Sequence, residues 1–102
     1  MKKLIISICL MLIAATGFGQ WTALTSGTAE YLSSIYFTSE DTGYVVGNNG
    51  TIIKTMDAGS TWNAQISGVN NNLRSVFFID ANNAFIVGKN GIILKTVNAG
   101  NI

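Results

Sequence analysis

The sequence predicts an all-β protein made of β-propeller blades, which are four-stranded antiparallel sheets, in an incomplete propeller of about two blades. The first reason is an internal repeat of 41 residues: residues 21–61 align with residues 62–102 without a gap, and 16 of the 41 pairs are identical. The second is that each unit contains short strands separated by turns, and four strands in roughly 40–50 residues is the period of a propeller blade. A β-sandwich or another all-β fold remains the alternative, although neither requires such a repeat.

Residues 1–19 have the pattern of a secretory signal peptide. Lys2 and Lys3 precede an apolar run over residues 4–15, and small residues follow up to a cleavage point expected near Gly19 and Gln20. The run has about twelve residues, whereas a membrane-spanning helix needs roughly 20. We therefore expect Sec-type export to the periplasm, the cell surface or the medium, with no membrane span left after cleavage.

The composition of the exported part narrows the possible chemistry. The single cysteine, Cys9, lies within the leader and the chain has no histidine, so the exported part has no disulfide and no imidazole or thiolate ligand for zinc, copper or haem. Four basic and five acidic residues give it a formal net charge of −1. Nucleic-acid binding would require a basic cluster, which this charge balance does not indicate. We also expect no cofactor.

The first unit, residues 20–61, supplies three of the four expected strands of a blade. Aromatic and β-branched residues are concentrated in residues 32–37, 44–47 and 51–55, as strands prefer, and residues 61–66 supply the fourth strand. Asn49 and Gly50 form the strongest short hairpin signal, because both residues tolerate the positive φ of a type I′ turn.

The second unit, residues 62–102, repeats this plan. Its expected strands cover residues 73–79, 85–88 and 91–97, and Asn90 and Gly91 repeat the hairpin turn. We expect an incomplete copy, with further blades needed to close the ring. Open faces and unpaired edges favour association, so residues 20–102 alone are expected to be aggregated or largely unfolded.

The first unit ends in the pattern Ser/Thr-x-Asp-x-Gly-x-Thr-Trp, which is called an Asp-box. Asp57 can accept hydrogen bonds from backbone N–H groups just ahead of it and so build a turn, and Gly59 permits a backbone conformation that is closed to most residues. Thr55 and Thr61 lie at the strand ends, where their hydroxyl groups can bond across the turn. Trp62 can bury its ring between neighbouring sheets.

The second unit carries a variant of the same turn. Thr96, Asn98 and Gly100 repeat the first three positions, with asparagine in place of the aspartate. A motif that recurs once per blade is expected to help the blade fold, whereas an active site would be unique. We therefore assign the Asp-box a structural role and expect no catalytic, cofactor-binding or metal-binding residue.

The repeat as a whole resembles the BNR/Asp-box propellers, and most closely the branch related to photosystem II assembly and stability factors. Its signature is Leu-x-Ser-[Ile/Val]-x-Phe followed by Gly-Tyr-Val-Val-Gly-Asn-Asn-Gly-Thr-Ile-Ile-Lys-Thr-x-Asp-Ala-Gly-x-Thr-Trp. The resemblance implies a ring that is typically seven-bladed. It also implies, for photosynthetic members, a chaperone that binds a reaction-centre subunit through an arginine-rich surface. Arg74 is the only arginine here. Related repeats also occur in secreted bacterial proteins, often before a C-terminal sorting domain.

Two functions follow as hypotheses. The first is a secreted, non-catalytic scaffold or binding module, similar to an assembly factor, for an unidentified protein or glycan partner. The loops over residues 27–31 and 68–72 are candidates for ligand contact. The second is the front part of a sialidase-like Asp-box glycoside hydrolase. That chemistry uses an arginine cluster with a tyrosine and a glutamate, or paired carboxyl groups. Tyr31, Tyr36 and Tyr44 are instead expected to be strand and core residues.

Overall fold

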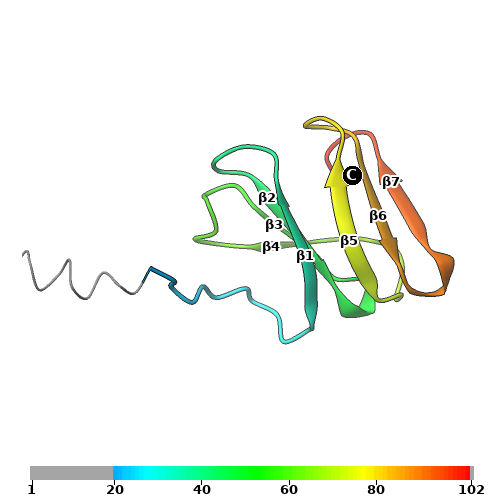
Figure 1. Ribbon diagram of the computed structural model, residues 1–102, viewed down its shortest axis with the longest axis horizontal. Coiled ribbons are helices and arrows are strands. Elements are labelled where there is room, and N and C mark those ends of the chain that lie inside the picture. Colours follow the sequence, from blue (N-terminus) through cyan, green and yellow to red (C-terminus); the bar gives the residue numbers. More distant parts are fainter. Residues whose placement is uncertain (1–19, 102) are drawn as a thin grey trace, which may run out of the picture.

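Figure 1 shows the computed structural model of the chain, which describes residues 20–101. Two antiparallel sheets lie side by side, and the all-β prediction is confirmed. The first sheet contains β1 (Leu32–Phe37), β2 (Gly43–Gly47), β3 (Ile52–Thr55) and β4 (Asn63–Gln65). The second contains β5 (Leu73–Phe78), β6 (Ala84–Gly88) and β7 (Ile93–Thr96). The predicted signal peptide, residues 1–19, lies outside the described residues.

Each sheet is a meander in which neighbouring strands along the chain are hydrogen-bonded. β1 pairs with β2, β2 with β3 and β3 with β4, and β5–β7 repeat the first three strands. The first sheet ends at Gln65, four residues inside the second sequence unit, so the boundary between sheets does not coincide with the boundary between repeats. β4 is also shorter than the predicted 61–66, because its pairing with β3 covers only three residues.

The turns between β2 and β3 and between β6 and β7 have the same geometry. Asn49 and Gly50 have φ values of 57° and 68°, and the N–H of Thr51 donates to the carbonyl of Asn48 at 3.1 Å. Asn90 and Gly91 have φ values of 63° and 75°. Positive φ at two successive central residues defines a type I′ turn, which matches the twist of an antiparallel pair. These turns keep both hairpins tight at the same end of the molecule.

The core lies between the two sheets. Tyr44 and Val46 of β2 pack against Leu73, Val76 and Phe78 of β5, and all five side chains are buried. Tyr36 and Ile52 line the same face of the first sheet and are partly buried against this core. When the two sheets pack, the apolar side chains on both facing surfaces are removed from water. This burial is the main contribution to the stability of the fold.

One aromatic residue, Tyr31, differs from its predicted place. Tyr31 precedes β1 and is 80% exposed, so the prediction that it is a strand and core residue is wrong. It lies in the loop before the sheet, where its backbone carbonyl accepts the N–H of Asn48. Trp62 is half-buried on the outer face of the first sheet, edge-to-face with Phe37. Between residues 20 and 101, no helix is long and apolar enough to cross a membrane.

Candidate functional site

The Asp-box of the first unit forms a closed network of hydrogen bonds. One carboxylate oxygen of Asp57, Oδ1, accepts the hydroxyl of Thr55 at 2.8 Å and the N–H of Thr61 at 2.9 Å. The other, Oδ2, accepts the Thr61 hydroxyl at 2.6 Å. Thr55 Oγ1 in turn accepts the N–H of Gly59 at 2.8 Å, and the Thr55 side chain is fully buried. Both carboxylate oxygens are therefore engaged within the turn.

These bonds favour the charged form of Asp57. The Thr61 hydroxyl, then the Thr61 backbone N–H and the Thr55 hydroxyl, lower the pKa of this carboxyl to about 2. A general acid at neutral pH needs a raised pKa, and a metal ligand needs a free lone pair directed away from the turn. Asp57 therefore has the electrostatics of a turn-forming residue.

The second Asp-box has the same backbone bonds with asparagine in the central place. Thr96 Oγ1 accepts the N–H of Gly100 at 2.8 Å and donates to the Asn98 side-chain oxygen at 2.8 Å. The Tyr44 hydroxyl donates to the carbonyl of Ala99 at 3.1 Å, in a buried bond 55 residues apart in sequence. This turn is therefore joined directly to the first sheet, which the sequence pattern alone did not indicate.

Asp80 forms the turn between β5 and β6, a role that the sequence analysis did not assign to this side chain. Its Oδ1 accepts the backbone N–H groups of Asn82 and Asn83, each at 2.9 Å. The Asn82 N–H, followed by the side chain and N–H of Asn83, lowers the pKa of Asp80. The sequence signal for this role was the repeat position of Asp80, because Ser39 lies 41 residues earlier in the equivalent polar segment. In the structure the Ser39 hydroxyl accepts the N–H groups of Asp41 and Thr42 in the same way.

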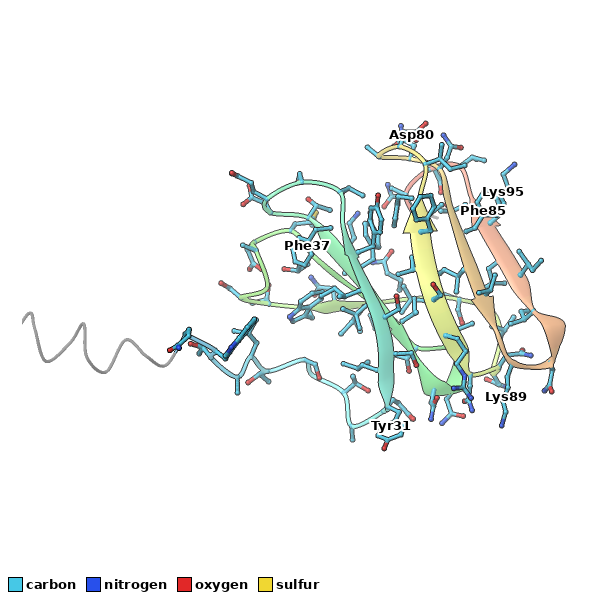
Figure 2. The ribbon with its side chains drawn as sticks, viewed as in Figure 1. Tyr31, Phe37, Asp80, Phe85, Lys89 and Lys95 are labelled. Atoms are coloured by element: carbon cyan, nitrogen blue, oxygen red, sulfur yellow. The ribbon has the colours of Figure 1, made fainter. Side chains whose placement is uncertain are left out.

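The Asn-Gly turns lie at the opposite end of the sheets from the Asp-boxes, together with the loops that precede β1 and β5. The Asn49 side-chain amide donates to both carboxylate oxygens of Glu30 at 3.1 Å, and the Asn49 N–H donates to Asn72 Oδ1 at 3.0 Å. Figure 2 shows Tyr31 and Lys89 at this end, and both side chains are exposed. We call this surface the loop end; it brings together both loops proposed for ligand contact.

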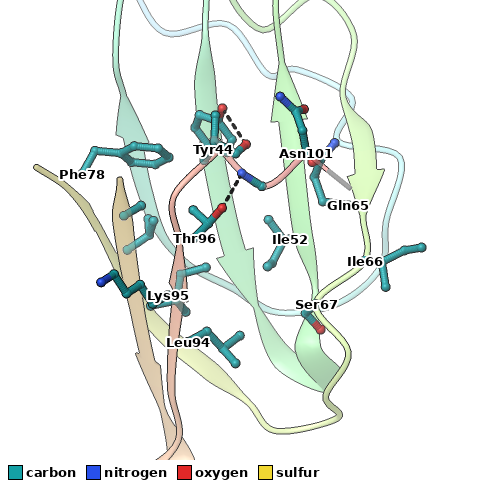
Figure 3. A pocket seen from close by; sticks show the side chains of 15 residues that line it. Tyr44, Ile52, Gln65, Ile66, Ser67, Phe78, Leu94, Lys95, Thr96 and Asn101 are labelled. Atoms are coloured by element: carbon teal, nitrogen blue, oxygen red, sulfur yellow. Dashed lines mark hydrogen bonds between the residues drawn. The ribbon is translucent and has the colours of Figure 1, made fainter. Parts of the chain in front are cut away.

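A cavity of about 250 Å³ opens between the outer edges of the two sheets (Figure 3). Ile52, Phe78 and Leu94 form its apolar wall, and Gln65 and Thr96 are among its polar residues. The residues that the structure describes contain no group of three His, Cys, Asp or Glu side chains placed to hold a metal ion. All buried polar side-chain atoms among them have a hydrogen-bond partner. The cavity is therefore mainly apolar space between the packed sheets, with polar side chains along part of its lining.

The fold and the Asp-box turns agree with one protein family. The family model described as "Photosynthesis system II assembly factor YCF48" matches residues 13–102. The chain belongs to this family. The YCF48 match supports the predicted resemblance to photosystem II assembly factor-like propellers and does not favour the glycoside hydrolase alternative. No curated protein matches the chain.

Two solved YCF48 structures are similar to the chain. The structure described as "YCF48 bound to D1 peptide" has a TM-score of 0.70 and 28% identity over 80% of this chain. The structure described as "YCF48 from Cyanidioschyzon merolae" has a TM-score of 0.69 and 26% identity over 79% of this chain. The chain spans 28% of the length of each. It therefore corresponds to a part of a YCF48-like propeller.

Proposed function

We propose that the chain is a non-catalytic binding module that holds a segment of a protein partner, as an assembly factor does. The observation that carries this proposal is its similarity to a YCF48 structure solved with a D1 peptide. The site chemistry supports it, because both oxygens of the Asp57 carboxylate are engaged within their own turn. A binding module needs an accessible surface, and propellers present theirs on loops.

The loop end is the surface that we propose for this partner. Tyr31 is 80% exposed there, and Glu30 and Lys89 carry charges of opposite sign at the same end of the molecule. Tyrosine is enriched at the core of protein interfaces, because its ring gives a large contact area and its hydroxyl a hydrogen bond. Loops joined by hydrogen bonds to the Asn-Gly turns hold this surface in one conformation, which limits the entropy lost on binding.

A titration with the D1 peptide tests the proposal. The fluorescently labelled peptide of the YCF48 complex is added to the chain, with a scrambled peptide as control, and fluorescence anisotropy is followed. We expect saturable binding of the D1 peptide alone. Tyr31→Ala should weaken it about tenfold, the effect of losing one contact of about 1.4 kcal/mol. Met56→Ala, an exposed residue of the Asp-box end, should leave it unchanged. Equal binding of the scrambled peptide, or of the Tyr31 variant, would contradict the proposal.

We further propose that the module acts outside the cytoplasm. The support is the leader pattern of residues 1–19, with its basic start and apolar run. Expression of the chain with its own leader, followed by mass spectrometry of the exported protein, should give a first residue at or beside Gln20. A protein retained in the cytoplasm with residues 1–19 intact would refute this part of the proposal.

A further inference from the structure

The turn between β2 and β3 contains a pair of residues that is chemically unstable in a flexible chain. In an Asn-Gly pair, the backbone nitrogen of the glycine can attack the side-chain carbonyl carbon of the asparagine, because glycine has no β carbon to shield that nitrogen. The new bond closes a succinimide ring and releases the side-chain amide nitrogen as ammonia. Water then opens the ring, which leaves aspartate or isoaspartate in place of asparagine. Asn49 and Gly50 form such a pair.

The attacking nitrogen is held away from this reaction in the folded chain. To attack, the Gly50 nitrogen must lose its proton and approach the Asn49 side chain. It instead donates that proton to the backbone carbonyl of Asn71 at 2.7 Å, and Gly50 is buried. Asn49 has φ 57° and ψ 36°, which places the Gly50 nitrogen on the side of the Cα–C bond away from the β carbon. The ring can therefore close only after the turn leaves this conformation and the bond to Asn71 breaks.

The amide that would leave is held as well. The side-chain nitrogen of Asn49 donates to both carboxylate oxygens of Glu30 at 3.1 Å. The backbone N–H of Asn49 donates to Asn72 Oδ1 at 3.0 Å. A hydrogen bond to a charged acceptor is stronger than one between neutral groups. Glu30 therefore fixes the side chain of Asn49, and because it contacts the amide nitrogen it does not remove the proton that the attack requires.

These contacts come from the two loops of the loop end. Glu30 lies in the loop before β1, whereas Asn71 and Asn72 lie in the connection that leads from β4 to β5. A β carbon on Gly50 would clash with the carbonyl oxygen of Val69 in the same connection, so this connection packs directly on the turn. The turn is therefore enclosed from two sides by other segments of the same chain.

We propose that Asn49 is a conditional modification site, which keeps its amide while the two loops enclose the turn and is deamidated when they open. The reaction needs only water and is not reversed, because the ammonia is lost. The aspartate product places a second carboxylate beside Glu30, so two hydrogen bonds are replaced by repulsion between like charges. The isoaspartate product adds a methylene group to the backbone of the turn, whose length sets the register of the hairpin.

The effect of deamidation extends beyond the first turn. The Lys89 N–H donates to the Asn72 carbonyl at 2.8 Å, and the Asn71 side-chain amide donates to the Lys89 carbonyl at 3.2 Å. The connection between the sheets thus holds both Asn-Gly turns at once. When its bonds to Asn49 and Gly50 are lost, it remains joined to the second turn only. Deamidation of Asn49 therefore loosens the whole loop end, whether or not a partner binds there.

Peptide mapping by mass spectrometry tests the proposal on the exported chain. The protein is incubated in mildly alkaline buffer with and without guanidinium chloride, and the peptide that contains Asn49 is quantified over time in its amide, aspartate and isoaspartate forms. We expect conversion to be at least about tenfold faster in the denaturant, because the protected state must open before the ring can close.

Variants assign the protection to the loops. Glu30→Ala removes the acceptor of the side-chain amide and should raise the rate at Asn49 by about two- to tenfold, the factor expected for a lost hydrogen bond. Glu30→Gln keeps an accepting oxygen and should stay closer to the wild-type rate. Asn72→Ala removes the acceptor of the Asn49 N–H and should also raise the rate. Glu40→Ala, an exposed glutamate between β1 and β2, is the matched control and should leave the rate unchanged.

Two outcomes would overturn the proposal. Equal rates with and without denaturant would show that the fold does not protect Asn49. A wild-type rate in Glu30→Ala, in protein whose far-UV circular dichroism shows intact β structure, would show that the loop before β1 does not control the reaction. Where Glu30→Ala does not fold, Asn72→Ala applies the same criterion to the connection between the sheets. None of these measurements uses the D1 peptide, so failure here and failure of the proposed binding function are distinguishable.

Discussion

Asp57 and Asn98 occupy equivalent places in two turns that share their backbone bonds but differ in charge. In both turns the preceding threonine accepts the N–H of a glycine four residues ahead at 2.8 Å. The aspartate adds a second accepting oxygen, which Thr61 uses at 2.6 Å. The neutral turn forms with the same geometry, so the carboxylate strengthens a turn whose shape the threonine and glycine already determine. The charge makes only the first turn sensitive to acid.

The lowered pKa of Asp57 predicts loss of stability in acid. A carboxyl group in an unfolded chain has a pKa of about 3.9, whereas that of Asp57 in the folded protein is about 2. The unfolded state therefore binds the proton first as the pH falls. The stabilising contribution of Asp57 is complete above about pH 4 and is lost as the pH falls through about 2. Urea unfolding at a series of pH values should show this decline.

Asp57→Asn is the matched control, because it copies the neutral turn of Asn98. The variant should be less stable than the wild-type chain at pH 7 and should depend less on pH between about 4 and 2. A smaller dependence will remain, since Asp80 also has a lowered pKa and contributes with the same sign. Identical pH profiles for the two proteins would rule out Asp57 as the source of the acid sensitivity.

At the scale of strands and turns, the sequence predicted what is encoded locally. β1 and the two Asn-Gly turns follow from residue type, because β-branched and aromatic residues favour strands and Asn-Gly tolerates positive φ. Tyr31 was misplaced because its strand-like residue type does not reveal that the chain is still in a connector at that point. The bond from Tyr44 to Ala99 was also not predictable, since no local pattern links residues 55 positions apart.

Gly50 has a contact role beyond its turn, and this predicts a difference between two glycines with positive φ. Gly68→Ala meets no neighbour within 4 Å, so its destabilisation should be about 1–2 kcal/mol from the unfavourable backbone conformation alone. Gly50→Ala carries the same strain, and its methyl group would also clash with the carbonyl oxygen of Val69, which must move. Urea unfolding should show a clearly larger loss for Gly50→Ala. Equal losses would mean that the connector moves freely away from the turn.

For the whole molecule, stability depends on which faces are covered, and sequence identity does not determine this. Leu32 and Leu73 are the same residue at the same place in the repeat, yet their exposed fractions are 42% and 0%. The difference arises because, among residues 20–101, the second sheet has a neighbouring sheet on the face of β5 and the first has none on the face of β1. The sequence of one repeat unit therefore predicts which side chains can pack in a core. It does not predict in which of the two units they are buried.

The same pair of leucines gives the last prediction. Leu73→Ala removes a fully buried side chain from the layer between the sheets and should lower the free energy of unfolding by about 2–5 kcal/mol. Leu32→Ala, measured in protein dilute enough to be monomeric, should lower it by less, because much of that side chain is already in water. Urea unfolding of both variants measures the two losses, and a loss for Leu32→Ala as large as that for Leu73→Ala would contradict the difference in burial.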